Sequence, residues 1–176
     1  LQTISNIKSS NSTRFASRTR VVEVSGRPLL VAERINPTGR PLFQTELKNG
    51  QTRNLRQEAE QQAKAGADLL DTNISVPDII EKDVMHTAVK AVQSASDLPL
   101  SIDSPQAAAL EAGLKTCCGR SLLNSVNGKK DSLERFLPLA KKYGAAIIAL
   151  VLDEKGIPNS AQERLSIARK IVESAK

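Results

Sequence analysis

The sequence predicts an α/β protein in which five βα units follow one another and place their strands in one parallel sheet. Short, nearly all-apolar runs alternate five times with stretches that have helical spacing. The apolar runs are continuous rather than alternating, which indicates strands buried on both faces, as in a parallel sheet covered by helices. Helix punctuation agrees, because Gly66 and Gly144 fall just past predicted helix ends and Ser104 precedes a proline at a predicted helix start.

The chain ahead of this alternation has a different character. Residues 1–19 are rich in Ser, Asn and Thr without any period, and they are predicted to be a flexible lead-in or linker. The folded domain is then predicted over residues 20–176. It opens with a β-hairpin whose arms cover residues 21–24 and 29–32 around the turn Ser25-Gly26-Arg27-Pro28, with the second arm running on into Glu33.

The alternation gives each element its bounds. The predicted strands are the apolar runs at residues 29–35, 67–74, 98–102, 121–126 and 145–152. The predicted helices lie at residues 53–65, 79–94, 106–116, 133–143 and 161–175. Residues 36–40, between the first strand and the first helix, are predicted to be a turn. An open doubly wound sheet and a closed barrel both alternate in this way, so periodicity leaves both folds open.

The overall composition fits one globular domain. With 176 residues, 40% apolar and 25% charged, the chain is long enough to bury a core. No apolar run approaches the roughly 20 residues that cross a bilayer, and no secretory signal pattern is present, so we predict a cytoplasmic protein without membrane contact. Because the first residue is Leu1 rather than Met, we expect an excised piece of a longer protein.

Residue types exclude several classes of function. The formal charge of +6 is spread over helices that also carry acidic residues, and three Phe, one Tyr and no Trp leave almost nothing for bases to stack on, which argues against nucleic-acid binding. Cys117 and Cys118 are adjacent, so we expect free thiols at a helix end. His86 is the only histidine, which leaves no material for a zinc site or a histidine triad. The glycine motifs of dinucleotide and P-loop sites do not follow the first strand.

Acidic and amide side chains stand at the carboxyl end of every predicted strand. In chain order they are Glu33, Asn36, Asp71, Asn73, Asp103, Asn124 and Asp153. The carboxyl ends of parallel strands meet at one rim, where ligands bind, so these side chains are predicted to converge. Each one taken singly is also an ordinary helix cap or turn residue. Five consecutive strand ends of this kind favour a ligand with many donors in one plane, such as a pterin, whose amino and ring N–H groups match a carboxylate.

Longer segments of the chain resemble a known family. They are VAERINPTGR, AKAGADLLDTNI, LPLSIDS, ALEAGLK, SLLNSVNG, LPLAKKYGAAIIAL and LDEKGIPNSAQERLSIARKIV. Across about residues 20–176 they look like the pterin-binding domain shared by cobalamin-dependent methionine synthase and the methyltetrahydrofolate:corrinoid methyltransferases. This resemblance implies a (β/α)8 barrel of the TIM type, related to dihydropteroate synthase and truncated here to about its first five βα units.

The resemblance also implies roles for individual residues. The residues similar to those that hold the donor edge of the pterin are Asp103 and Asn124. The residues that would line the same floor are Asp71, Asn73, Glu33 and Asn36.

Two features depart from the family pattern. Ala32 and Ser75 stand where the family usually has glycine. The chain also stops at Lys176, whereas the family continues through three more βα units that carry another pterin-binding aspartate and a mobile asparagine. We therefore expect no catalytic residue within this chain and little or no activity of the piece alone.

The function that the resemblance implies is methyl transfer from N5 of methyltetrahydrofolate to the cobalt of a cobalamin or other corrinoid. The expected partners are a corrinoid-binding domain or protein, and either the remaining barrel segment or a second copy of the chain. Three alternatives stay open: an enzyme similar to dihydropteroate synthase, a corrinoid methyltransferase with another donor such as glycine betaine, and an inactive truncated fragment.

Overall fold

The computed structural model describes residues 12–176, which form a parallel sheet of five strands covered by helices and preceded by a small antiparallel hairpin. The strands are β1 (Arg14–Ala16), β2 (Val21–Glu23), β3 (Val31–Ile35), β4 (Leu69–Asn73), β5 (Leu100–Asp103), β6 (Leu122–Asn127) and β7 (Ala146–Leu150). The helices are α1 (Pro41–Lys48), α2 (Arg53–Lys64), α3 (Glu81–Ala95), α4 (Ala107–Thr116), α5 (Lys130–Tyr143) and α6 (Ala161–Ser174). Within residues 12–176, no helix has both the length and the apolar character that crossing a membrane requires.

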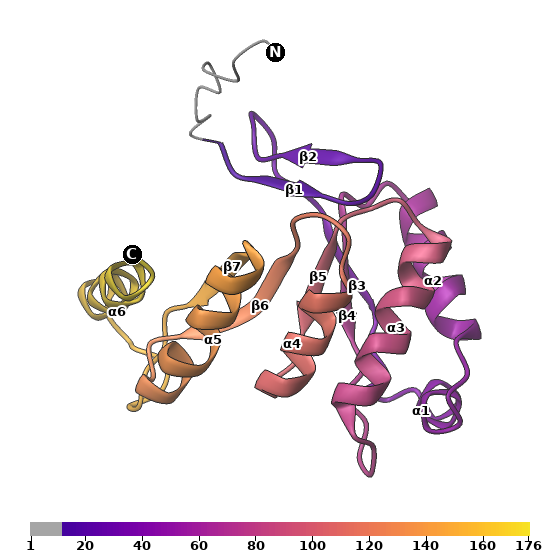
Figure 1. Cartoon of the computed structure of the whole chain (residues 1–176). Coiled ribbons are helices and arrows are strands. Elements are labelled where there is room, and N and C mark those ends of the chain that lie inside the picture. The colour runs from indigo at the N-terminus through magenta and orange to yellow at the C-terminus, as the bar shows by residue number, and fades with distance from the viewer. Residues whose placement is uncertain (1–11) are drawn as a thin grey trace, which may run out of the picture.

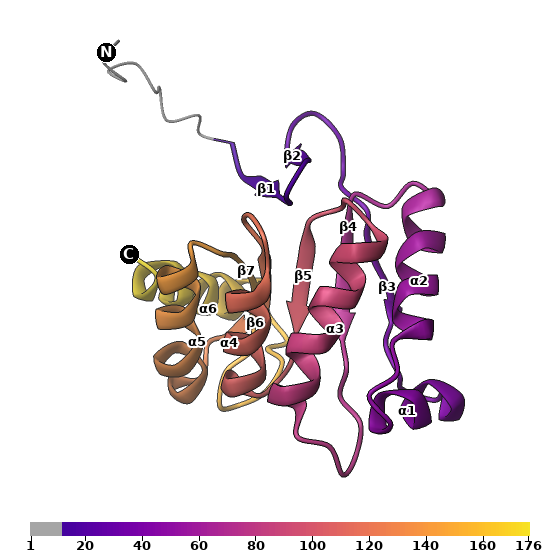
Figure 2. The same cartoon turned by 45° about the vertical axis from the view of Figure 1, so that its right-hand side comes forward.

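The strand order decides between the two folds that periodicity left open. Strands β3, β4, β5, β6 and β7 are neighbours in the order in which the chain makes them. Figures 1 and 2 show α2, α3, α4 and α5 on one and the same face of the sheet. A doubly wound sheet carries helices on both faces, whereas a (β/α)8 barrel adds strands in chain order under a single outer layer of helices. The prediction of the first five units of such a barrel is confirmed.

The predicted elements lie within a few residues of the observed ones, with one helix missed. Residues 36–40 form the expected turn, but α1 follows it directly, and its Pro41 stands in the first helical turn. Phe43 and Leu47, one turn apart, are each 2% exposed and hold α1 against the core. A proline followed by two apolar residues one turn apart is a helix signal, but in a segment of only eight residues this signal is weak.

The predicted N-terminal hairpin is present, but only its first predicted arm takes part, because residues 21–24 correspond to β2 whereas residues 29–32 do not pair with it. β2 pairs antiparallel with β1, which lies in the segment predicted as a lead-in. Residues 29–32 pair instead with the sheet, where Val31 is opposite Leu69 of β4. The physical cause is Asp68, whose carboxylate accepts hydrogen bonds from the Arg27 guanidinium at 2.6 and 2.8 Å and from the Leu30 N–H at 2.8 Å. Residues 1–11 of the predicted lead-in lie outside the described residues, and the domain boundary at residue 20 stays a prediction.

The hairpin closes the amino end of the sheet. Phe15 and Val22 are buried against Leu69 and Leu122, which point away from the helix layer. The Ala16 N–H donates to the Arg120 carbonyl at 2.9 Å and fastens β1 to the chain ahead of β6. Figure 1 shows the hairpin at the end of the sheet opposite α1, so the carboxyl ends of the strands stay free of it.

Gly119 packs against β1 next to the hydrogen bond between Ala16 and Arg120, and we expect Gly119→Ala to destabilise the fold. Its φ is +90°, and a Cβ would overlap the Ala16 carbonyl group. The left-handed backbone alone costs an alanine about 1–2 kcal/mol, and displacement of β1 adds to that. Gly66→Ala is the matched control, because Gly66 has φ +92° and open space around it. Urea unfolding should show a larger loss for Gly119→Ala, and equal losses would contradict the docking role.

The main core lies between the sheet and its helices. Leu70, Ile102 and Leu123 point from three neighbouring strands into this layer, where they meet side chains such as Met85. Helix α4 approaches β5 closely at Gly113, since a Cβ there would lie 2.5 Å from Ile102 Cγ2. With this face committed to the core, the opposite face of the same strands is available for other side chains.

Ser104 does not have the predicted capping role. Helix α4 begins at Ala107, and its N-cap Gln106 makes no side-chain capping bond. The Ser104 hydroxyl accepts from the Gln106 N–H at 3.0 Å and donates to Glu81 at 2.6 Å. Because α4 begins only after Gln106, the bond from the Gln106 N–H closes a turn in the loop after β5 rather than capping the helix, while the same hydroxyl reaches a buried carboxylate of α3.

Candidate functional site

The inner face of the sheet changes from apolar to polar along the strands. At the amino end it carries Leu69 and Leu122, packed against the hairpin. Two residues further on, β4 presents Asp71, and the alternation of a strand then brings Asn73 to the same face. Asp103 of β5 is the register partner of both Asn73 and Asn124. The predicted convergence of second-, third- and fourth-strand residues is therefore present as one row across three strands.

Asp71 is the most deeply placed carboxylate of this face. It is 3% exposed, and its Oδ1 accepts from Asn124 Nδ2 at 3.2 Å. Burial raises the pKa of Asp71 to about 6, and the charges of Asp103 and Glu33 add to the rise. The Asn124 amide and the Ser101 hydroxyl oppose it, although Ser101 Oγ does not reach hydrogen-bond geometry with any described group. Asp71 is thus held partly towards its neutral form by its surroundings.

Asp103 lies nearer the mouth and is half-buried. Its Oδ2 accepts from Asn73 Nδ2 at 2.8 Å. Burial raises the pKa of Asp103 above its ordinary value, Asn73 opposes the rise, and the charges of Glu33 and Glu81 add to it. No described side chain donates to Oδ1, so one oxygen of this carboxylate is available to a ligand.

Glu33 reaches the same face from β3. The register of β3 against β4 shifts between Ala32 and Ile35. Arg34, the next residue, points to the helix side, where its Nε donates to Glu58 at 3.0 Å. Glu33 consequently faces inward, is exposed, and acts electrostatically on both Asp71 and Asp103.

Asn36 and Asp153 have a different local role. Asn36 Oδ1 accepts from the Thr38 N–H at 3.0 Å, and Asp153 Oδ1 accepts from the Lys155 N–H at 2.9 Å. Both are the local turns that Asn and Asp commonly make. No hydrogen bond between described residues links either of them to the row on the inner face. Ligand binding by these two stays a prediction, and their turns alone account for their residue types.

One residue that the sequence did not single out lies beside the row, and it is Glu81. Glu81, at the first position of α3, is 6% exposed and accepts hydrogen bonds from the hydroxyls of Ser75 and Ser104, each at 2.6 Å. In the sequence Glu81 is an ordinary first-turn acid beside Lys82 and Asp83, and such an acid is favourable at a helix N-terminus. Only the folding of two separate loops onto one helix end reveals its partners.

The charge balance of the site is negative. Among residues 12–176, no Lys, Arg or His forms an ion pair with Glu33, Asp71, Asp103 or Glu81, whereas other buried carboxylates such as Glu58 and Asp68 pair with arginines. Buried carboxylates without a cation need donors. The arrangement can therefore hold a flat group that presents several N–H donors along one edge, with carboxylate oxygens of Asp103 and the amide oxygen of Asn124 as acceptors.

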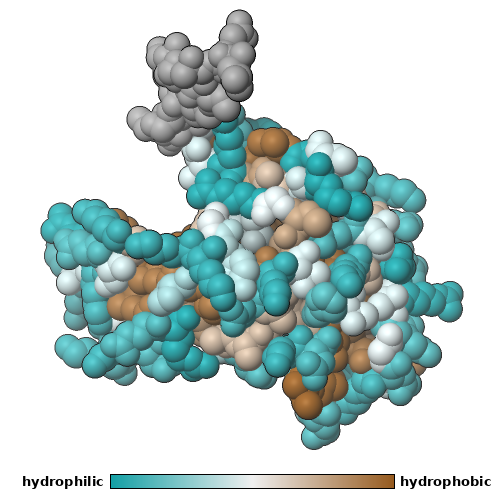
Figure 3. All heavy atoms as spheres, in the orientation of Figure 1, coloured by the Kyte–Doolittle hydropathy of each residue, from teal (hydrophilic) through white to brown (hydrophobic). Residues whose placement is uncertain are grey.

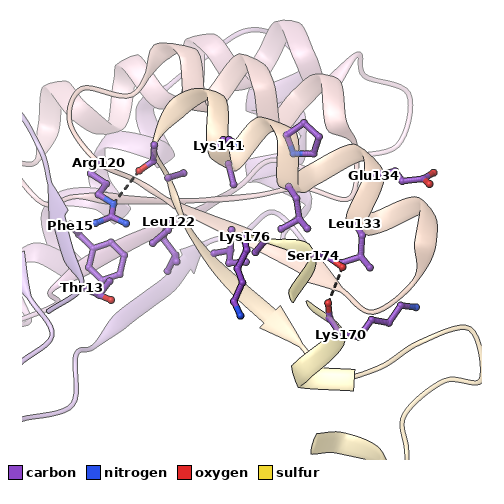
Figure 4. A pocket seen from close by; sticks show the side chains of 18 of the residues that line it. Thr13, Phe15, Arg120, Leu122, Leu133, Glu134, Lys141, Lys170, Ser174 and Lys176 are labelled. Atoms are coloured by element: carbon purple, nitrogen blue, oxygen red, sulfur yellow. Dashed lines mark hydrogen bonds between the residues drawn. The ribbon is translucent and has the colours of Figure 1, made fainter. Parts of the chain in front are cut away.

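A groove between the described elements lies elsewhere. It has a volume of about 1090 Å³ and lies between β6, β7, α5, α6 and the hairpin, with Phe15, Leu122 and Ala146 among its lining residues (Figure 4). Leu122 and Ala146 begin their strands, so this groove opens at the amino end of the sheet. It contains none of the seven predicted site residues. In barrels of this kind ligands bind at the carboxyl ends, and we place the candidate site there.

Comparison with known proteins supports the same kind of ligand. A family model described as "Pterin binding enzyme" matches residues 32–176. Methionine synthase of Mycobacterium tuberculosis is 30% identical over 152 residues, which are 82% of this chain and 12% of that protein. Methylcorrinoid:tetrahydrofolate methyltransferase of Eubacterium limosum is 29% identical over 150 residues, which are 84% of this chain and 55% of that protein. The chain thus spans only part of the length of both relatives.

Solved structures share the fold. Dihydropteroate synthase from Vibrio fischeri has a TM-score of 0.59 at 18% identity, and the enzyme from Thermus thermophilus has a TM-score of 0.57 at 22% identity. In each case the similarity covers 93% of this chain and 61% of the other. At these identities the likeness supports the barrel architecture alone.

Proposed function

This chain belongs to the family of pterin binding enzymes, and from that premise we propose that its inner face holds the ring of 5-methyltetrahydrofolate for methyl transfer to a corrinoid. The observation that carries the proposal is the row Asn73, Asp103 and Asn124, with Asp71 beneath it, on one face of three neighbouring strands. We propose these four as substrate-binding residues together with Glu33, and we keep Asn36 and Asp153 as predicted positions at the mouth.

The donor edge of the pterin fits the acceptors of this row. The 2-amino group and ring N–H groups would donate to Asp103 Oδ1 and to Asn124 Oδ1, because the second polar atom of each side chain is already used inside the protein. Each charge-assisted hydrogen bond contributes on the order of 1.5–3 kcal/mol, so two or three suffice to orient the ring. Asn73 and Asn124 fix the two carboxylates before the ligand arrives, which lowers the ordering cost of binding.

A quaternary ammonium donor such as glycine betaine fits this face less well. Such cations are held by aromatic cages. The four aromatic residues of the chain are Phe15, Phe43, Phe136 and Tyr143. Phe15 packs at the amino end, Phe43 and Phe136 lie in the helix-side core, and the Tyr143 hydroxyl donates to Glu111. None of them belongs to the inner row, which favours the pterin.

The protein would orient the methyl donor rather than react with it. As the methyl group leaves N5, that nitrogen must gain a proton or a hydrogen bond. We assign this proton to a residue outside the present sequence, because the matched relatives are longer than the chain. A corrinoid held by another domain or protein would supply the cobalt that accepts the methyl group.

The rim of the site offers a surface for such a partner. Leu42, Ile80 and Ile157 are 82%, 70% and 71% exposed, and they lie on the segments that follow β3, β4 and β7. Exposed apolar side chains around a functional mouth are often part of a protein contact. We propose that the corrinoid-binding domain docks over them, which a shift in sedimentation on mixing with a corrinoid protein would detect.

Among residues 12–176, no further strand pairs with the outer side of β3 or of β7. Leu150 of β7 and Leu165 and Val172 of α6 are 41%, 52% and 58% exposed, and Figure 3 shows apolar surface on the side where β7 and α5 lie. Open edges invite pairing with another chain. We propose that either the remaining barrel units or a second copy covers this side. The cytoplasm stays the predicted location.

A ligand screen by calorimetry tests the function. We expect 5-methyltetrahydrofolate to bind the chain and glycine betaine not to bind, while purified monomer transfers no methyl group to a corrinoid protein. Binding of 4-aminobenzoate would support the dihydropteroate synthase alternative instead. Light scattering on the same sample should show association that rises with concentration. Preferential binding of glycine betaine, or no binding by any pterin, would overturn the proposal.

A further inference from the structure

Glu81 and four other residues form a closed ring behind the row, made of four hydrogen bonds and one step along the chain. Asn73 Nδ2 donates to Asp103 Oδ2 at 2.8 Å, and the Ser75 N–H donates to Asn73 Oδ1 at 3.0 Å. Ser75 Oγ then donates to Glu81 Oε1, and Ser104 Oγ donates to Glu81 Oε2, each at 2.6 Å. Ser104 follows Asp103 in the chain, which closes the ring.

The ring joins three separate elements. Asn73 and Ser75 belong to the end of β4 and its loop, Asp103 and Ser104 to the end of β5 and its loop, and Glu81 to the start of α3. Ser104 reaches a third strand as well, because its N–H donates to the Asn124 carbonyl at 3.3 Å. Both oxygens of one buried carboxylate are therefore used to hold two loops at a fixed separation.

We propose that Glu81 is the positioning residue of the site, which clamps the loops after β4 and β5 through Ser75 and Ser104 and thereby aims Asp103 and Asn73 at the ligand. The inference rests on the proposed pterin site and names a residue that does not touch the pterin. A carboxylate suits the role because it accepts from two hydroxyls at once, with no cation to pull it away among the described ion pairs.

A purely structural role for Glu81 at the helix start makes a different prediction. An acidic residue in the first turn stabilises a helix through its dipole wherever it points. Asp83 is the second first-turn acid of α3, but it is exposed and takes no part in the ring. Asp83→Asn is thus the matched control, since it removes the same charge from the same helix end.

The electrostatic setting adds a second readout. Burial is the main cause of the raised pKa of Asp103, the hydrogen bond from Asn73 opposes it, and the charges of Glu33 and Glu81 add to the rise. Asp71 also lies near Asp103, and its pKa is raised mainly by burial, with a further rise from the charges of Asp103 and Glu33. Glu81→Gln keeps a side chain of the same shape that can bond both hydroxyls, and it removes the charge.

The test uses three variants of the whole chain. Glu81→Ala should weaken binding of 5-methyltetrahydrofolate about tenfold, as expected when roughly 1.4 kcal/mol of preorganisation is lost. Glu81→Gln should stay within about threefold of the unchanged protein, because it restores the two contacts. Asp83→Asn should bind like the unchanged protein. Where Glu81→Ala fails to fold, the single variants Ser75→Ala and Ser104→Ala take its place and should each weaken binding.

Nuclear magnetic resonance tests the ring without any ligand. The Asn73 side-chain amide should lose its protection from hydrogen exchange in Glu81→Ala and keep it in Glu81→Gln. The carboxyl carbon of Asp103 should titrate at lower pH in Glu81→Gln. Unchanged Asn73 protection in Glu81→Ala, or equal effects of Glu81→Ala and Asp83→Asn, would overturn the positioning role. If the pterin does not bind the unchanged protein, the proposed function is wrong. The spectra would still test whether Glu81 holds the ring together.

Discussion

Asp71→Asn is expected to stabilise the chain at pH 7 by about 1–3 kcal/mol and to lose most of this gain by pH 4. The pKa of Asp71 is raised from 3.8 to about 6, so the folded chain binds more protons than the unfolded chain between these two values. The free energy of unfolding therefore falls as the pH rises through that window and stays lower above it. Asparagine keeps the acceptor for Asn124 and carries no charge to desolvate.

The measurement is urea unfolding of both proteins at pH 7 and pH 4. Asp83→Asn is the control, because Asp83 is exposed and its substitution should change stability little at either pH. A stabilisation of the same size at both pH values would contradict the argument from ionisation. Destabilisation at pH 7 would show that the fold depends on the charged form of Asp71. A gain would mean that the site holds this acid at a cost in stability, as binding sites often do.

Asp103→Ala is expected to weaken pterin binding by more than tenfold. The variant removes the half-buried carboxylate that is proposed to face the donor edge of the ring. One charge-assisted hydrogen bond is worth about 1.5–3 kcal/mol, and 1.4 kcal/mol corresponds to a factor of ten in affinity. Calorimetric titration of 5-methyltetrahydrofolate into the two proteins measures the difference.

Stability should not explain that loss. Burial raises the pKa of Asp103, so the ionised carboxylate is itself unfavourable in the fold, and its removal should leave the urea midpoint nearly unchanged. Asp103→Asn should fall between the two proteins, because it retains one acceptor oxygen. Equal binding by Asp103→Ala and the unchanged protein would remove Asp103 from the site and leave the row without its central member.

Prediction from the sequence succeeded for elements whose residue types have a single usual environment, such as apolar runs in buried strands. The continuous apolar runs marked the strands from β3 to β7 because burial on both faces leaves no room for alternation. Of the acids and amides predicted at the strand ends, Asn73 and Asp103 are the last residues of β4 and β5, whereas Asp71 is the middle residue of β4. The hairpin partner of β2 was wrong because Asp68, far along the chain, fastens residues 27–30 to the sheet. Such a contact has no local signal.

The sequence alone also could not separate ligand residues from turn residues. In the sequence, Asn36 and Asp153 occupy the same kind of position as Asp71 and Asp103. In the structure, Asn36 and Asp153 accept hydrogen bonds from their own loops. Asp71 and Asp103 instead accept hydrogen bonds from side chains of other strands. The difference depends on which face of the strand each side chain takes and on the register with the next strand. Glu81 shows the same point, because its two partners lie on loops that only the packing of α3 brings together.

By itself the sequence determined the class of fold, the order of its units and the residue types at the mouth, because these follow from local periodicity and from where apolar runs end. Tertiary structure alone decided which carboxylates share one face, how strongly burial shifts their pKa values and which serines hold Glu81. Those properties depend on distances between strands and on the water excluded between them, and neither quantity is encoded in any single segment.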